Sequence, residues 1–171
     1  MKVKKKIANM ITKNLILLMG NIGSGKSTYS KKYQKKGYII LSRDNLRYAI
    51  GGGKYIFNVD YEPIIKKTDL YMFKKFVESE VNIVLDETNV NKEMRKKYIP
   101  YAKKRGYRIT VIELPRFCKE ESVKRRMKKS HGKFPKYIWE KVWTNFDKLY
   151  ERPSLAEGIN HIIHIERDKV I

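Results

Sequence analysis

The chain has 171 residues, 42% of them hydrophobic, and a formal net charge of +21 from 39 lysine and arginine against 18 aspartate and glutamate residues. This length and apolar content exclude a disordered chain and favour one globular domain over residues 1–171. No apolar run approaches the roughly 20 residues that span a bilayer, and the single cysteine, Cys118, excludes a disulfide framework, so the sequence indicates an intracellular, cytoplasmic protein without a membrane partner.

The chain begins with a basic segment over residues 1–13, which is expected to be a loose tail. The apolar run "NLILLMG" (14–20) then predicts a strand buried on both faces. Similar runs predict strands over 38–42, 81–87, 107–114 and 159–165. Helical spacing predicts a long helix that begins near Pro63, a second over about 94–102 that ends before Gly106, and two more over about 119–130 and 136–150.

Strands that alternate with helices are typical of an α/β fold with a mostly parallel sheet of 4–5 strands and helices on both faces. Binding sites in such folds gather at the carboxyl ends of the strands. The polar motifs of this chain stand one step beyond predicted strand ends, which places them together at one edge of the sheet.

"GNIGSGKST" (20–28) matches G-x-x-x-x-G-K-[ST] directly after the first strand. Such a P-loop turns backbone N–H groups toward phosphate oxygens, and the next helix adds its positive dipole end. Lys26 is expected to reach the β- and γ-phosphates of ATP, and the Ser27 hydroxyl to ligate Mg²⁺. The expected ATP-binding residues of the loop are Gly20, Asn21, Ile22, Gly23, Ser24, Gly25, Lys26, Ser27 and Thr28.

"IVLDETN" (83–89) ends another strand in carboxylates. Asp86 is positioned to hold Mg²⁺ opposite Ser27, although Glu87 competes for that role. The alternative is that both carboxylates cap the next helix.

"SRDNLR" (42–47) contains the first acidic residue of the chain, Asp44. Together with "GNIGSGKST", "LDETN" and "VKRRMKKSHGKFP", it resembles the P-loop polynucleotide 5′-hydroxyl kinases over most of residues 14–150. The resemblance implies an adenylate-kinase-like three-layer α/β/α sandwich with a helical lid near residues 116–136. It also implies that Asp44 is the general base and that Arg47 contacts the substrate phosphate.

The same resemblance assigns Asp86, Thr88 and Asn89 to the metal and acceptor region. Basic lid residues are implied to close over the ATP phosphates, and the sequence offers Arg125, Arg126, Lys128 and Lys129 for this. Arg125 is the foremost candidate for catalysis, with Lys129 as a further ATP contact. This sequence departs from the family in its lid, where lysines follow the arginine pair and give only point-charge contacts with phosphate.

Residue chemistry supports the assignment of Asp44 separately, since a strand-end carboxylate across from the phosphate loop can accept a proton from an incoming hydroxyl. The alternatives are that Asp44 caps the following helix or pairs with Arg47 on its surface. Trp139 and Trp143 are four residues apart, a spacing that favours core packing over stacking on a base. The glycine-rich segment 51–63, with Lys54, Tyr55 and Phe57, is either an acceptor loop or a plain connector.

Charge favours a polyanionic acceptor, because residues 92–136 contain 17 basic and 4 acidic residues, a net charge of +13. A general lysine bias is the alternative explanation. The leading hypothesis is an ATP- and Mg²⁺-dependent kinase of 5′-hydroxyl ends of RNA or DNA, as in nucleic acid repair, without an obligate protein partner. The alternatives are a kinase for a small hydroxyl compound, a nucleoside or an aminoacyl-tRNA, and an ATP-gated nucleic-acid-binding protein.

Overall fold

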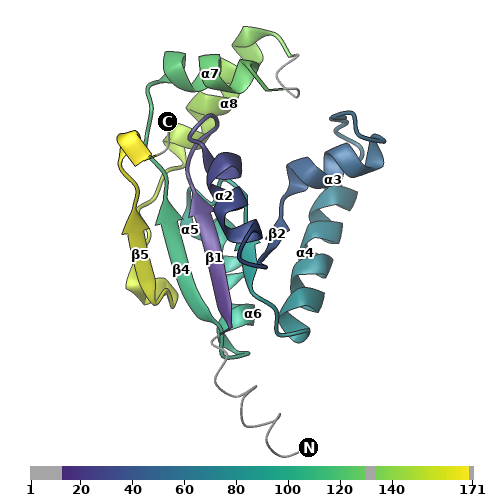
Figure 1. Cartoon of the computed structure of the whole chain (residues 1–171). Helices are drawn as coiled ribbons and strands as arrows, with labels where there is room; N and C mark the ends of the chain where they lie inside the picture. Colours follow the sequence, from purple (N-terminus) through teal and green to yellow (C-terminus); the bar gives the residue numbers. More distant parts are fainter. Residues whose placement is uncertain (1–12, 130–133, 170–171) are drawn as a thin grey trace, which may run out of the picture.

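A computed structural model describes residues 13–129 and 134–169, so nearly all of the predicted basic tail lies outside the described residues. Its sheet contains β1 (Asn14–Met19), β2 (Ile39–Leu41), β3 (Ile83–Leu85), β4 (Arg108–Glu113) and β5 (His161–His164). The strand order is β2-β3-β1-β4-β5, and every pairing is parallel (Figure 1). The predicted α/β fold and the five predicted strands are confirmed.

The helices follow the strands as predicted, with one exception. They are α2 (Lys26–Gln34), α3 (Arg43–Ile50), α4 (Glu62–Glu78), α5 (Lys92–Lys96), α6 (Ile99–Lys103), α7 (Lys119–Met127) and α8 (Lys136–Lys148), with 3₁₀ turns η2 (Leu155–Glu157) and η3 (Arg167–Lys169). The single helix predicted over 94–102 is wrong, because Pro100 stands at the start of α6. A proline lacks the N–H that would continue α5, so the chain turns and begins a second short helix there.

Helices cover the two faces of the sheet unequally (Figure 1). On one face, Leu15, Leu17 and Met19 of β1 join a core that includes Phe73 and Val77 of α4 and residues of α6. On the other face, Ile16 and Leu18 pack with the partly buried tyrosines of α2. The residues from Leu15 to Met19 are 5% exposed or less, which confirms a strand buried on both sides.

Helices α7 and α8 form a lid with a small core of its own above the phosphate loop (Figure 1). Ile22 of the loop, Val123 of α7 and Trp139 of α8 are buried together, and Trp143 packs against them. The core role favoured by the spacing of the two tryptophans is therefore confirmed. No helix among the described residues is both long and apolar enough to cross a membrane.

A buried ion pair ties the segment after β3 to the C-terminal part of the fold. The Arg95 side chain is fully buried and donates two hydrogen bonds, each 2.8 Å long, to the carboxylate of Glu157, which is 7% exposed. The same guanidinium donates to the carbonyl oxygens of Asn89 and Glu151. Arg95 therefore fixes the backbone just beyond the end of β3.

We expect Glu157→Ala to lower the free energy of unfolding by about 3–5 kcal/mol, because it leaves a buried guanidinium without its carboxylate. Urea denaturation measures this change. Glu166→Ala is the control: its ion pair with Lys169 is exposed on both sides, so a loss of less than about 1 kcal/mol is expected. Equal losses in the two variants would contradict the importance of the buried pair.

Candidate functional site

The phosphate loop follows β1 and leads into α2, as the motif predicts. Gly25, at the N-cap of α2, has φ 98°, and Gly23 has φ 71°. A Cβ on Gly23 would lie 2.3 Å from the carbonyl oxygen of Ser122, on α7. Glycine at position 23 therefore permits both the left-handed turn and the close approach of the lid.

Lys26 folds back over this loop. Its Nζ donates to the carbonyl oxygens of Gly20 and Asn21, each at 2.8 Å, and to Ser24 Oγ at 3.3 Å. Burial lowers the pKa of the Lys26 ammonium to about 8, although the nearby Asp86 carboxylate acts to raise it. The amine is therefore held where backbone oxygens surround it and where an anionic ligand would favour its charged form.

Asp86, just beyond β3, faces the start of α2. It is 9% exposed and accepts a 3.3 Å hydrogen bond from Ser30 Oγ. Burial raises the pKa of this carboxyl group, and Lys26 and hydrogen bonds from Ser27 and Ser30 oppose that rise. A hydroxyl and a carboxylate beside a phosphate loop fit the oxygen donors that Mg²⁺ prefers, so Ser27 and Asp86 are the residues that would hold it.

Glu87, the residue after Asp86, contacts the first turn of α3. It accepts a 2.6 Å hydrogen bond from the backbone N–H of Arg43 and a 2.8 Å bond from Arg43 Nε. A further contact joins the same carboxylate to the Arg43 guanidinium. Glu87, which lies just beyond β3, thus caps the first turn of α3, while the Ser42 side chain makes no cap hydrogen bond.

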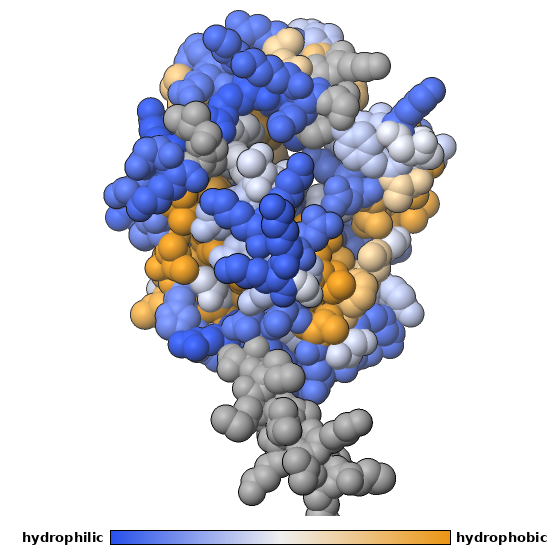
Figure 2. Space-filling model, in the orientation of Figure 1, coloured by the Kyte–Doolittle hydropathy of each residue, from blue (hydrophilic) through white to orange (hydrophobic). Residues whose placement is uncertain are grey.

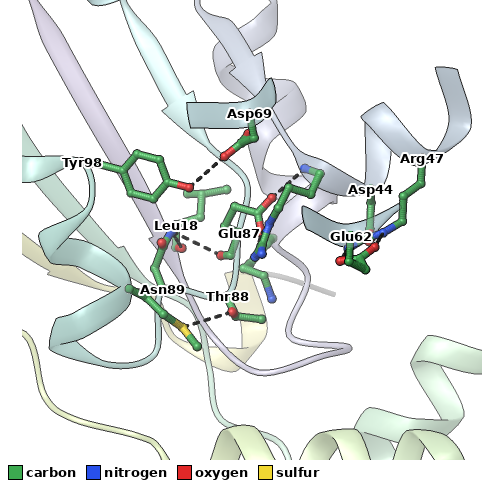
Figure 3. A network of polar contacts seen from close by, with 12 residues as sticks. Leu18, Asp44, Arg47, Glu62, Asp69, Glu87, Thr88, Asn89 and Tyr98 are labelled. Atoms are coloured by element: carbon green, nitrogen blue, oxygen red, sulfur yellow. Dashed lines mark hydrogen bonds and ion pairs between the residues drawn. The ribbon is translucent and has the colours of Figure 1, made fainter. Parts of the chain in front are cut away.

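Behind this pair lies a second buried carboxylate. Asp69 of α4 is 2% exposed and accepts a 2.8 Å hydrogen bond from the Tyr98 hydroxyl (Figure 3). Burial, and next the charge of Glu87, raise the pKa of Asp69 to about 6. The Arg43 guanidinium opposes this rise, so the charge of Arg43 acts on both carboxylates.

We expect Glu87→Ala to slow phosphate transfer by up to about a hundredfold with little change in nucleotide affinity, because it frees the first turn of α3 without touching the phosphate loop. Misplacing a reacting group by about 1 Å can cost that much. Glu87→Gln keeps an acceptor for the Arg43 N–H and should retain more activity. Single-turnover kinetics and nucleotide titration check both variants, and equal losses in the two would contradict a capping role.

Asp44 is the second residue of α3 and the centre of a polar cluster. Its Oδ1 accepts hydrogen bonds from Arg47 at 2.6 Å and from the Tyr55 hydroxyl at 3.1 Å. Its Oδ2 accepts a 3.3 Å hydrogen bond from the guanidinium nitrogen Nη2 of Arg126, on the lid helix α7. The two oxygens therefore face Arg47 and Tyr55 on one side and the lid on the other, and the pairing of Asp44 with Arg47, one of the alternatives to a base role, is observed.

Arg47 is held by two carboxylates. Besides Asp44, it donates to both oxygens of Glu62, at 2.8 and 2.7 Å (Figure 3). Its guanidinium also lies 5.9 and 5.6 Å from the ring centres of Tyr55 and Phe57. Sequence reasoning missed Glu62, because no spacing rule links a residue at the start of α4 to one near the end of α3.

The lid arginines differ in their surroundings. Arg126 reaches Asp44, and its guanidinium lies 4.6 Å from the centre of the Trp139 ring. Arg125 lies 4.3 Å from the centre of the Phe117 ring and 3.9 Å from Glu121. The structure thus brings Arg126, rather than the foremost sequence candidate Arg125, into contact with Asp44.

Thr88 and Asn89 make scaffold contacts. The carbonyl oxygen of Thr88 accepts a 3.0 Å hydrogen bond from Gly20 N, which joins the start of the phosphate loop to the exit of β3. Asn89 is 1% exposed and donates from Nδ2 to the carbonyl oxygen of Leu18 at 2.9 Å (Figure 3). Its φ of 47° is one that asparagine tolerates better than most residues.

These groups surround one cleft of about 970 Å³ between the sheet edge, the segment 51–63, here called the acceptor segment after its proposed role, and the lid. Tyr55 and Phe57 line it, but Lys54 does not. Phe57 crosses toward the lid, where its ring centre lies 6.2 Å from that of Phe134. The candidate residues that line the cleft are Ile22, Gly23, Ser24, Gly25, Lys26, Ser27, Thr28, Asp44, Arg47, Asp86, Glu87, Thr88, Asn89, Arg125, Arg126, Lys128 and Lys129, whereas Gly20 and Asn21 do not line it. Over the described ranges, no cluster of three or more histidine, cysteine or acidic side chains forms a further metal site.

Comparison with known proteins places this arrangement in a family. The chain is 26% identical to L-seryl-tRNA(Sec) kinase of Methanococcus maripaludis, over 91% of this chain and 67% of that protein. It is 30% identical to a predicted bifunctional polynucleotide kinase/RNA ligase of Autographa californica nuclear polyhedrosis virus, over 72% of this chain and 19% of that protein. The chain therefore spans about two thirds of the first relative and a fifth of the second.

The fold also matches a chain in the structure of the Pnkp1/Rnl/Hen1 RNA repair complex. The TM-score is 0.64 at 24% identity, covering 81% of this chain and 45% of that one. A family model described as an AAA domain matches residues 15–153. The chain therefore belongs to this AAA domain family and has the fold of P-loop kinases.

Proposed function

We propose that this P-loop kinase transfers the γ-phosphate of ATP to the 5′-hydroxyl end of a polynucleotide, with Asp44 as general base. One observation carries the proposal: the Asp44 carboxylate lies in the same cleft as the phosphate loop, and its charge acts on the Lys26 ammonium. A base and a phosphate clamp that share one cleft are what phosphoryl transfer to a hydroxyl requires.

In the proposed reaction, the acceptor hydroxyl oxygen bonds to the γ-phosphorus, the bond to the β,γ-bridging oxygen breaks, and the hydroxyl proton passes to Asp44. Lys26 and the loop N–H groups hold the β- and γ-phosphates, and Mg²⁺ on Ser27 and Asp86 would neutralise their charge. Arg126, which extends from the lid helix α7 to Asp44, is suited to contact the γ-phosphate once ATP fills the loop. In this assignment Arg125 and Lys129 contribute positive charge from the lid.

Three observations support a polynucleotide acceptor. The viral relative is a predicted polynucleotide kinase/RNA ligase. The charge of residues 92–136 is strongly positive, and Lys97, Lys128 and Lys129 of this region line the cleft. Arg47, which Asp44 and Glu62 hold in place, lines the same cleft and is the arginine proposed to contact a substrate phosphate.

A labelled-phosphate screen tests this proposal. Wild-type protein with γ-labelled ATP and Mg²⁺ is offered 5′-hydroxyl RNA, 5′-hydroxyl DNA, the same strands carrying a 5′-phosphate, nucleosides and aminoacylated tRNA. The proposal expects label on the 5′-hydroxyl strands and none on the 5′-phosphorylated controls. Equal labelling of the two kinds of strand, or none of either, would contradict it.

The second candidate is a kinase that acts on an aminoacylated tRNA. The archaeal relative, matched over 91% of this chain, is an L-seryl-tRNA(Sec) kinase, and a strongly basic surface also suits tRNA. Label on seryl-tRNA that is released with the serine on mild deacylation, without label on 5′-hydroxyl oligonucleotides, would select this candidate.

A further inference from the structure

The last turn of α2 and the turn that follows it carry four exposed lysines, Lys31, Lys32, Lys35 and Lys36, here called the lysine strip. No acidic residue stands anywhere in the chain before Asp44. Figure 2 shows the resulting hydrophilic column over α2 at the centre of the face, between more apolar surface on both sides. Neither the phosphate loop nor the lid accounts for this charge.

The strip combines a high density of lysines, four within residues 31–36, with a segment that contains no acidic residue. Some exposed lysines elsewhere, such as Lys75 and Lys136, pair with a glutamate three or four residues along their own helix. Within the part of the chain that the structure describes, the four lysines of the strip form no ion pair with a carboxylate. Lys32 and Lys36 instead lie 4.6 and 5.6 Å from the ring centres of Tyr29 and Tyr33.

Those tyrosines are anchored and so fix the direction of the strip. Tyr29, Tyr33 and Tyr38 pack edge to face or tilted along the sheet side of α2, with ring centres 6.0 and 5.3 Å apart. By helical spacing, Lys31 and Lys35 lie opposite Tyr29 and Tyr33, whereas Lys32 and Lys36 lie beside these rings, and all four lysines are exposed. Uncompensated ammonium groups in a row attract a polyanion, because each neutralised phosphate releases a counterion.

The strip is continuous with the cleft. Lys31 lines the cleft together with Thr28 at the start of α2. A helix rises about 1.5 Å per residue, so Lys35, the C-cap of α2, lies about 13 Å along the helix axis from Lys26. That distance corresponds to about four nucleotides of a stacked strand.

We propose that the lysine strip binds the sugar-phosphate backbone of the acceptor a few nucleotides from its reacting 5′ end, which makes the preferred acceptor an oligonucleotide rather than a mononucleotide. This inference rests on the proposed function, since it takes the 5′ end to lie beside Asp44. The strip should not discriminate between nucleotide sequences, because lysines that contact phosphates do not contact the bases. It therefore determines acceptor length and salt sensitivity.

A length series tests the strip. Fluorescent 5′-hydroxyl RNA of 4 and 12 nucleotides is titrated with wild-type protein and with a triple variant, Lys32→Gln, Lys35→Gln and Lys36→Gln. The matched control replaces Lys67, Lys74 and Lys104 by glutamine, which removes the same charge from exposed positions on the opposite side of the sheet. Binding of a non-hydrolysable ATP analogue verifies that all three proteins are folded.

We expect the strip variant to bind the 12-mer about tenfold more weakly at low salt and to lose the wild-type preference for the 12-mer over the 4-mer. The slope of log affinity against log salt concentration should become shallower by about 2, because each phosphate contact with a single strand contributes about 0.7 to that slope and three lysines are removed. The control variant should keep both properties. Equal weakening in the two variants, or none in either, would overturn the inference.

Two further outcomes distinguish this inference from a lipid-binding role of the strip and from the proposed kinase activity. Loss of binding to phosphatidylserine vesicles in the strip variant, with oligonucleotide binding intact, would assign the strip to a lipid surface and overturn the inference. Strip-dependent binding of the 12-mer, without phosphate transfer by the wild-type protein to any 5′-hydroxyl end, would uphold the strip and overturn the proposed kinase activity.

Discussion

Asp44→Asn is expected to slow phosphate transfer about 100- to 10,000-fold, the range that a positioned general base contributes. The amide cannot take the proton from the acceptor hydroxyl, yet it has nearly the shape of the carboxylate. Because Asp44 belongs to α3 and not to the phosphate loop, the affinity for ATP should change by less than tenfold. Single-turnover transfer to a 5′-hydroxyl oligonucleotide and separate nucleotide titration measure the two quantities.

Asp60→Asn is the matched control, because Asp60 is an exposed carboxylate in the same acceptor segment. It should transfer phosphate at the wild-type rate. If Asp44→Asn also keeps that rate, Asp44 does not accept the proton and serves to hold Arg47 and Arg126. If nucleotide affinity falls as much as the rate, the carboxylate contributes to the phosphate site.

Lys26→Met has the second large expected effect, a loss of nucleotide binding together with loss of transfer. The Lys26 amine occupies the centre of the loop, 2.8 Å from two backbone carbonyl oxygens, and no other described lysine makes these contacts. Methionine has a similar length without the charge. Isothermal titration with ATP and Mg²⁺ checks the loss of binding, and wild-type affinity in the variant would contradict the assignment.

The pH dependence of nucleotide binding gives Lys26 a separate signature. Its pKa in the free protein is lowered to about 8, so the amine is charged below that pH and neutral above it. A phosphate needs the charged form, and we therefore expect ATP affinity to fall up to tenfold per pH unit above about 8. Residual binding by Lys26→Met should lack this step. A wild-type affinity that stays constant up to pH 10 would contradict the lowered pKa.

The parts of the fold that depend on local pattern could be predicted from the sequence. The run from Leu15 to Met19 is apolar throughout because both faces of β1 are covered, and the glycines of the loop follow from the turn that phosphate binding requires. The same reasoning placed Asp44 and Asp86 at one edge of the sheet, and both line the cleft.

The partners of these residues could not be predicted, because they come from segments that only tertiary packing brings together. Glu62 holds Arg47 from 15 residues away, and Glu87 caps α3 from the segment after β3. The sequence left Glu87 as a rival of Asp86 for Mg²⁺, and the structure separates them by direction: Asp86 faces Ser30 and Glu87 faces Arg43. The apolar spacing over 94–102 is that of one helix, and it does not show that Pro100 divides this stretch into α5 and α6.

Acceptor and lid residues were the hardest to assign from sequence. Both Arg125 and Arg126 of α7 line the cleft, and the sequence does not indicate that Arg126 contacts Asp44 and Trp139 whereas Arg125 packs against Phe117. Burial of Asn89 and its hydrogen bond to Leu18 likewise depend on the turn after β3, which the motif alone does not describe.

Position-specific analysis of the labelled product tests the central claim most directly. Wild-type protein and Asp44→Asn are incubated with γ-labelled ATP and the same 5′-hydroxyl oligonucleotide, and the product is digested to mononucleotides. The proposed function predicts that the wild-type protein places all label in the 5′-terminal nucleoside 5′-monophosphate and that the variant leaves almost none there. Label at any other position, or equal labelling by the two proteins, would contradict it.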